Sequence, residues 1–99
     1  MSVIHGNEKD FEILVNKDLV LVDFFATWCG PCKMLGPVLG SLENIDVVKI
    51  DVDECPDLAR KYGIMSVPTL MLFSNGELKN KQSGFMPKEA LEEWISENK

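Results

Sequence analysis

The chain has 99 residues, of which 45% are hydrophobic and 26% are charged, as is ordinary for one globular domain covering residues 1–99. Its 16 acidic and 10 basic residues give a net charge of −6, which argues against nucleic acids and anionic membranes as main partners. The longest apolar runs, 19–22 and 70–73, are too short to span a membrane, and the first six residues lack the pattern of a signal peptide, so we expect a cytoplasmic protein.

The chain begins with alternating strand and helix patterns. Residues 2–5 are a candidate edge strand. Residues 8–15 place apolar side chains at helical spacing, with Asn7 as the N-cap. Residues 19–25 are apolar at nearly every position, which is typical of a strand buried on both faces of a parallel sheet.

The middle of the chain continues this alternation. A loop over residues 26–31 leads into a helix that ends near residue 42. A second buried strand follows over 47–52, and a short helix over 56–62 ends at Gly63.

The last part of the chain predicts a hairpin and a helix. Pro68 opens a strand over 69–73, an Asn-Gly pair at 75–76 marks the turn, and the chain returns along 77–83. The final helix starts at Pro87 and buries one face, made of Leu91, Trp94 and Ile95. The whole order predicts an α/β fold with a mixed central sheet, parallel in its first half and antiparallel in its C-terminal hairpin, with helices on both faces.

A pair of cysteines stands between a buried strand and the helix that follows it. The free backbone amides and the dipole at the helix N-terminus stabilise a thiolate on Cys29, which makes it a nucleophile. Cys32 lies one turn further in and less exposed, placed to form a disulfide with Cys29 or to attack a mixed disulfide there. Pro31 fits the first helical turn and stiffens the loop. The arrangement predicts thiol–disulfide exchange in two displacements.

Two other uses of the cysteine pair stay open at this point. A closed zinc site needs four ligands, and the chain offers Cys55 and His5 to complete one. A purely structural disulfide would not require Trp28, Gly30 or Pro31 around it.

The segment 22–33, VDFFATWCGPCK, resembles the active-site segment of thioredoxins. The similarity then extends over nearly the whole chain, through residues 48–53, 62–64, 67–70 and 84. A bare CxxC is a weak signal, whereas WCGPC after an apolar strand, with a VPT tripeptide whose proline lies 36 residues beyond Cys32, is specific. The resemblance implies the thioredoxin fold.

Asp23 interrupts an otherwise apolar strand, so its carboxyl is expected to be buried, where desolvation favours the protonated form. An acid turned to solvent at the strand end is the alternative. In thioredoxins the matching aspartate lies behind the buried cysteine, so the resemblance implies that Asp23 is a general base for Cys32. It also places Lys49 beside Asp23 in support of proton transfer, while a lysine reaching water is equally compatible with the sequence.

Pro68 alone predicts no more than the start of a strand after a trans bond. The resemblance implies instead a cis bond after Val67, facing the cysteines, with the Val67 backbone pairing with an extended substrate strand. It also implies a shallow apolar rim for protein substrates, made of Trp28, Gly30, Pro31, Val67, Pro68 and Gly84. For Trp28 the alternative is an aromatic ring that packs on its own loop.

The resemblance implies a protein-disulfide oxidoreductase that reduces client proteins. No nucleotide or metal motif is present, so we expect no bound cofactor beyond the redox disulfide. Electrons would come from a thioredoxin reductase that uses flavin and NADPH, and we expect the chain to act as a monomer. The alternatives are an oxidase or isomerase of secreted proteins, whose relatives usually carry His in place of Pro31, a redox-inactive binding module, and a glutaredoxin.

Three other positions are distinctive. Cys55 precedes Pro56 at a predicted helix start, which would lower its pKa as for Cys29. No resolving cysteine stands beside it, so an inert thiol is favoured over glutathionylation or an intermolecular disulfide. Phe25 occupies a place where many thioredoxins carry tryptophan, and the bulk of Phe85, where a small residue is commoner, would narrow the choice of partners.

Overall fold

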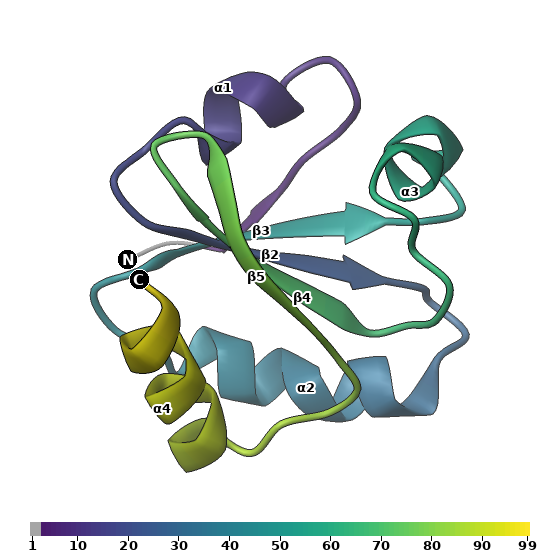
Figure 1. Ribbon diagram of the computed structural model, residues 1–99. Coiled ribbons are helices and arrows are strands. Elements are labelled where there is room, and N and C mark those ends of the chain that lie inside the picture. Colours follow the sequence, from purple (N-terminus) through teal and green to yellow (C-terminus); the bar gives the residue numbers. More distant parts are fainter. Residues whose placement is uncertain (1–2) are drawn as a thin grey trace.

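The computed structural model describes residues 3–99, which form a five-stranded sheet with helices on both faces (Figure 1). The strands are β1 (Val3–His5), β2 (Val20–Phe25), β3 (Asp46–Asp51), β4 (Thr69–Ser74) and β5 (Glu77–Ser83). The helices are α1 (Phe11–Val15), α2 (Gly30–Gly40), α3 (Pro56–Lys61) and α4 (Lys88–Asn98).

The sheet is mixed, as predicted, with the strand order β1-β3-β2-β4-β5. Strand β3 pairs in parallel with both β1 and β2, whereas β4 runs antiparallel to β2 and β5 antiparallel to β4. The predicted edge strand is confirmed over Val3–His5, and position 2 lies outside the described residues. The parallel register sets Asp23 on β2 directly beside Lys49 on β3.

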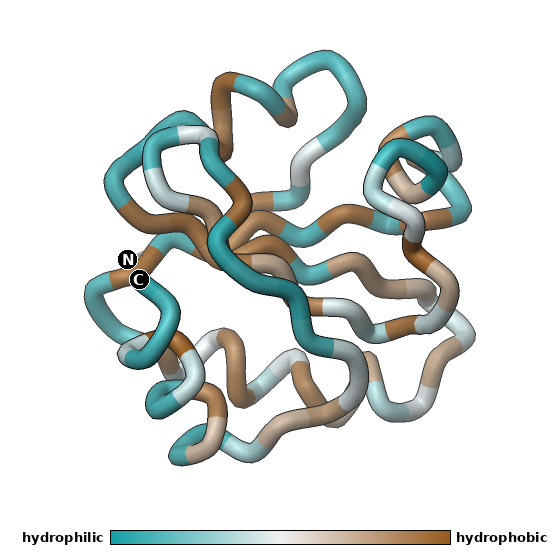
Figure 2. The backbone as a smooth tube through the Cα atoms, in the orientation of Figure 1, coloured by the Kyte–Doolittle hydropathy of each residue, from teal (hydrophilic) through white to brown (hydrophobic). Residues whose placement is uncertain are grey.

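Strand β2 alternates its side chains between two apolar cores, one on each face of the sheet. Val22 and Phe24 belong to the core covered by α1 and α3, and Leu21 belongs to the core covered by α2 and α4. Trp94 lies in the second core, as predicted. Figure 2 shows the apolar central strands in brown behind the hydrophilic outer strand β5. By this alternation Asp23 faces the same side as Leu21, toward α2.

Helix α1 begins three residues later than the periodicity predicts, at Phe11 rather than at residue 8. The side-chain oxygen of Asn7 accepts hydrogen bonds from the backbone amides of Lys9 and Asp10, at 2.8 and 3.1 Å. Asn7 therefore stabilises a separate turn before the helix instead of capping it, because short polar side chains of this kind compete with helical hydrogen bonding.

The hairpin turn between β4 and β5 is confirmed. Asn75 and Gly76 have φ values of 52° and 82°, so both occupy the left-handed region. Two such residues in succession suit a tight turn that follows the natural twist of the two strands. Helix α3 also ends as predicted, with Gly63 in the left-handed conformation at φ 62°.

Glu8 joins the first loop to α3. Its carboxylate accepts hydrogen bonds from the backbone amides of Asp57 and Leu58, at 2.8 and 3.3 Å, and so satisfies two donors at the start of α3. We expect Glu8→Ala to lower the free energy of unfolding by about 1 kcal/mol, since a helix cap is lost. Urea denaturation measures this change.

Glu12→Ala is the matched control for Glu8→Ala. Glu12 also reaches α3, but through an exposed ion pair with Lys61 whose side chains are 75% and 55% accessible. Exposed ion pairs contribute little, so this variant is expected to leave the stability nearly unchanged. Equal losses in the two variants would contradict the capping role of Glu8.

Candidate active site

Cys29 and Cys32 form a disulfide at the N-terminus of α2, with their Cα atoms 5.3 Å apart. Cys29 is the N-cap residue, with extended backbone angles, and its sulfur accepts a hydrogen bond from the Cys32 amide at 3.2 Å. Pro31 lies in the first turn, where its missing amide hydrogen costs nothing. The predicted position of Cys29 at the helix start is therefore confirmed.

The two cysteines differ less in exposure than expected. Cys29 is 5% exposed and Cys32 3%, so both are buried. They pack with Ala26 and are flanked by Val52 and Val67. The Val67 carbonyl lies 3.7 Å from the Cys29 sulfur, so a main-chain acceptor stands beside the atom that a substrate would meet.

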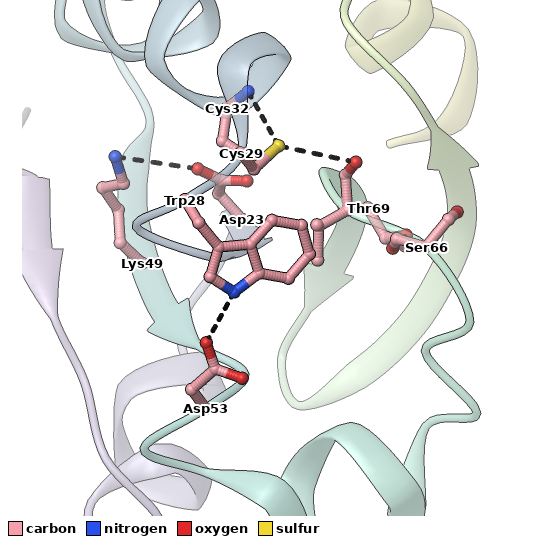
Figure 3. Close-up of a disulfide and its surroundings, with 9 residues drawn as sticks. Asp23, Trp28, Cys29, Cys32, Lys49, Asp53, Ser66 and Thr69 are labelled. Carbon is pink, nitrogen blue, oxygen red and sulfur yellow. Dashed lines mark hydrogen bonds and ion pairs between the residues drawn. A yellow bond between two sulfur atoms is a disulfide. The ribbon is translucent and has the colours of Figure 1, made fainter.

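Asp23 is completely buried, which rules out the alternative of an acid turned to solvent. Neither of its carboxyl oxygens has a hydrogen-bond partner among the described residues. The Lys49 ammonium lies 3.8 Å from Oδ2, so the predicted neighbour is present. Burial raises the pKa of Asp23 from 3.8 to about 6, although the charge of Lys49 lowers it in part. Figure 3 shows the carboxyl pointing toward the cysteine pair, with Lys49 on its other side.

Trp28 is exposed and anchored at the same time. Its side chain is 68% accessible, and its indole N–H donates a hydrogen bond of 2.9 Å to Oδ2 of Asp53 (Figure 3). Asp53 was not predicted as a site residue. The sequence carries no local signal for this contact, because Asp53 stands 25 residues away, just beyond β3.

The predicted rim residues gather around the disulfide to different depths. The peptide bond between Val67 and Pro68 is cis, as the resemblance implies. Pro68 itself is buried, and Gly84 is joined to it by a hydrogen bond from its amide to the Pro68 carbonyl, at 2.8 Å. Gly84 has φ 95°, a conformation that side-chain-bearing residues rarely adopt. Gly30 and Pro31 are exposed beside Cys29.

A shallow apolar groove of about 190 Å³ continues this rim away from the disulfide. Four of its wall residues were not anticipated, namely Val52, Ile64, Met65 and Ser66. Met65 is 95% exposed, which is unusual for a large apolar side chain. Apolar surface of this kind indicates an interaction site.

The chain matches the family profile described as Thioredoxin over residues 2–97. It belongs to the thioredoxin family. It is 43% identical to the thioredoxin of Bacillus subtilis (strain 168) and 45% identical to that of Staphylococcus aureus (strain Mu50), each alignment covering 99% of both chains.

Solved thioredoxin structures have the same fold. A mutant thioredoxin from Halobacterium salinarum NRC-1 superposes with a TM-score of 0.88 at 39% identity, over 98% of this chain and 89% of that one. Plasmodium falciparum thioredoxin gives a TM-score of 0.85 at 32% identity, over 95% of this chain and 96% of that one. The predicted thioredoxin fold and the protein-disulfide oxidoreductase class are thereby confirmed.

The alternatives to a redox pair find no support in the structure. Within residues 3–99, no group of three or more His, Cys, Asp or Glu side chains is placed to hold a metal ion. The cysteine pair is a thioredoxin redox disulfide. In the same part of the chain, no helix is long and apolar enough to cross a membrane.

The expected lowering of the Cys55 pKa is wrong. Cys55 stands at the N-cap of α3, but its side chain makes no capping hydrogen bond and the residue is 3% exposed. Burial raises the pKa of Cys55, and the nearby carboxylate of Glu8 raises it further. Because Glu8 occupies the free amides of α3, the helix start does not activate this thiol. The inert interpretation of Cys55 is therefore favoured.

Proposed function

We propose that this thioredoxin-family chain is a general reductant of protein disulfides in the cytoplasm. The observation that carries this proposal is the disulfide at the start of α2 with a buried carboxyl behind it. In the dithiol form, the Cys29 thiolate attacks one sulfur of a client disulfide, whose S–S bond breaks and releases the first client thiolate. Cys32 then attacks the Cys29 sulfur, releases the second client thiolate and restores the Cys29–Cys32 disulfide.

Asp23 takes the proton of Cys32 in the second displacement. With a pKa of about 6, its carboxyl is mostly ionised at neutral pH and still basic enough to accept a proton. A surface cavity of about 210 Å³ is lined by Cys32 and Lys49, among others, and has room for water that would relay the proton. Lys49 supports the transfer by stabilising the ionised carboxyl.

Clients bind as extended segments across the rim. The Val67 carbonyl accepts a main-chain amide of the client, as in strand addition, while Pro68 supports it from below. Gly30, Pro31 and Gly84 have little or no side chain to obstruct that approach. Trp28 supplies the apolar wall on the other side of Cys29, held by Asp53. Such a surface suits many clients rather than one small molecule.

The partners follow from the same chemistry. Each cycle leaves an oxidised disulfide, so two electrons must come from a reductase, for which we propose an NADPH-using flavoprotein thioredoxin reductase. The chain, a single domain over residues 1–99, needs no bound cofactor of its own and works as a monomer. Its net charge of −6 disfavours nucleic acid as a partner.

The direction of electron flow is tested by the midpoint potential of the Cys29–Cys32 couple, measured at equilibrium in dithiothreitol buffers. We expect a potential below that of the cytosolic glutathione pool, as a reductant requires. A potential well above that pool would indicate an oxidant and overturn the proposal. The Cys55→Ser variant, measured in parallel, should give the same potential, since Cys55 lies outside the site.

A further inference from the structure

The Lys49 ammonium, from β3, lies close to two groups on the neighbouring strand β2. Its Nζ is 3.8 Å from Oδ2 of Asp23 and 4.6 Å from the centre of the Phe25 ring. The register explains this arrangement: Lys49 pairs with Asp23 across β2 and β3, and Phe25 stands two residues further along β2 on the same face. The ring and the carboxyl therefore both approach the ammonium from the same face of β2.

The contact with Asp23 is a weak tether for a lysine. A separation of 3.8 Å is too long for a hydrogen bond, and both carboxyl oxygens lack one. A lysine side chain is flexible, and its ammonium gains hydration by extending into water. Lys49 is nevertheless held with its side chain 16% exposed. The electron-rich face of an aromatic ring attracts a cation at the distance seen for Phe25.

The Phe25 ring also contacts a side chain from β1, the edge strand on the far side of β3. The ring of His5 on β1 meets it edge-on, with centroids 6.2 Å apart and an interplanar angle of 75°. His5 is also the residue that pairs with Lys49 across β1 and β3.

We propose that Phe25 is a positioning residue whose ring holds the Lys49 ammonium beside Asp23 and so keeps the buried carboxyl ionised. A non-aromatic side chain of similar size would fill the same space but release Lys49 toward water. The consequence for catalysis rests on the proposed role of Asp23 as the base for Cys32.

Few other charges bear on this site. Lys49 is the charged group that acts on Asp23 among residues 3–99, and β4 presents the apolar Leu70 opposite it. From α2, Lys33 lines the same cavity as Lys49. His5 contacts the Phe25 ring from β1, so a His5→Gln variant is needed to separate its contribution from that of Phe25.

The test follows the ¹³C chemical shift of the Asp23 carboxyl against pH in the oxidised protein. Lys49→Met removes the ammonium charge and should raise the titration midpoint of Asp23. This shift is the largest that displacement of Lys49 can produce. Phe25→Leu should raise the midpoint by roughly half a pH unit, and Phe25→Trp should restore the wild-type value because it keeps an aromatic face. Phe25→Met provides a second non-aromatic variant should Phe25→Leu not fold.

A wild-type midpoint in both non-aromatic variants, together with a raised one in Lys49→Met, would overturn the proposal. If Phe25→Trp shows the same raised midpoint as Phe25→Leu, the proposal is overturned as well, because the effect would then come from packing and not from the aromatic face. The His5→Gln variant should titrate near the wild-type midpoint. A shift as large as that of Phe25→Leu would assign the effect to the histidine instead.

The rate at which Cys32 resolves a mixed disulfide, measured against pH, separates this inference from the proposed function. If Asp23 is the base, the pH profile of Phe25→Leu should move upward with the carboxyl midpoint. A shifted carboxyl midpoint with an unchanged rate profile would support the positioning role of Phe25. It would overturn the general-base role of Asp23.

Discussion

Replacing Asp23 with asparagine is expected to raise the free energy of unfolding of the oxidised protein at pH 8 by about 2 to 3 kcal/mol. The wild-type carboxyl is completely buried without a hydrogen bond, and its pKa rises from 3.8 to about 6 on folding. At pH 8 the folded protein therefore holds a buried negative charge that the unfolded chain exposes to water. Asparagine removes that charge while keeping nearly the same shape.

The sign of this effect fixes its pH dependence. Between pH 3.8 and about 6 the folded state binds more protons at Asp23 than the unfolded state does. The wild type consequently loses stability as the pH rises through this window, whereas Asp23→Asn does not lose that contribution. Urea denaturation from pH 3.5 to 8 should show two curves that meet at low pH and separate above it. Equal stabilities at pH 8 would contradict the buried charge.

The same variant is expected to lose function. Without a carboxylate to accept the Cys32 proton, resolution of a mixed disulfide should slow by roughly a hundredfold at pH 7, the lower end of what general bases contribute. Release of a labelled thiol from a preformed mixed disulfide measures this step directly. Resolution at the wild-type rate would show that Asp23 is not the base. If Asp23→Asn is more stable than the wild type but resolves the mixed disulfide more slowly, the buried charge of Asp23 destabilises the fold and serves catalysis.

Substitution of the two redox cysteines is expected to have the largest effect on activity. Cys29→Ser replaces the attacking thiolate with a hydroxyl that stays protonated at neutral pH, so reduction of a protein disulfide should fall by at least about a thousandfold. Cys32→Ser keeps the attacking group but lacks the resolving one. It should therefore accumulate a covalent mixed disulfide with its client, visible on a non-reducing gel.

Cys55→Ser is the matched control for these two substitutions. Cys55 is buried at the start of α3, outside the site, and its raised pKa disfavours the thiolate. This variant should reduce clients at the wild-type rate. Client capture by Cys32→Ser that disappears on adding Cys55→Ser would show that the third cysteine, not Cys29, makes the covalent bond.

The sequence alone predicts features that depend on residues close together in the chain. The nearly continuous apolar run of β2 indicates a strand buried on both faces, and the Asn-Gly pair at 75–76 indicates the hairpin. The break in that apolar run at Asp23 already points to a buried carboxyl. The predicted start of α1 at residue 8 is wrong, because Asn7 accepts hydrogen bonds that stabilise a turn before the helix.

The contacts that complete the site join residues far apart in the chain, and periodicity carries no information about them. Trp28 meets Asp53 across 25 residues, and the Val67 carbonyl reaches Cys29 across 38. The resemblance to thioredoxins supplied Lys49 and the cis bond at Pro68, which the residues alone left open.

Cys55 shows most clearly what tertiary structure decides. Its place before Pro56 predicts a lowered pKa for its thiol, because a helix start offers free amides and a favourable dipole. In the folded chain, Glu8, which bonds to α3 across 49 residues, accepts the hydrogen bonds of those amides and adds its own negative charge. The sequence by itself thus determined the order of the elements and the redox pair, since neighbouring residues set both. Folding decided which charges meet, because the sign of a pKa shift depends on what is brought near the group in space.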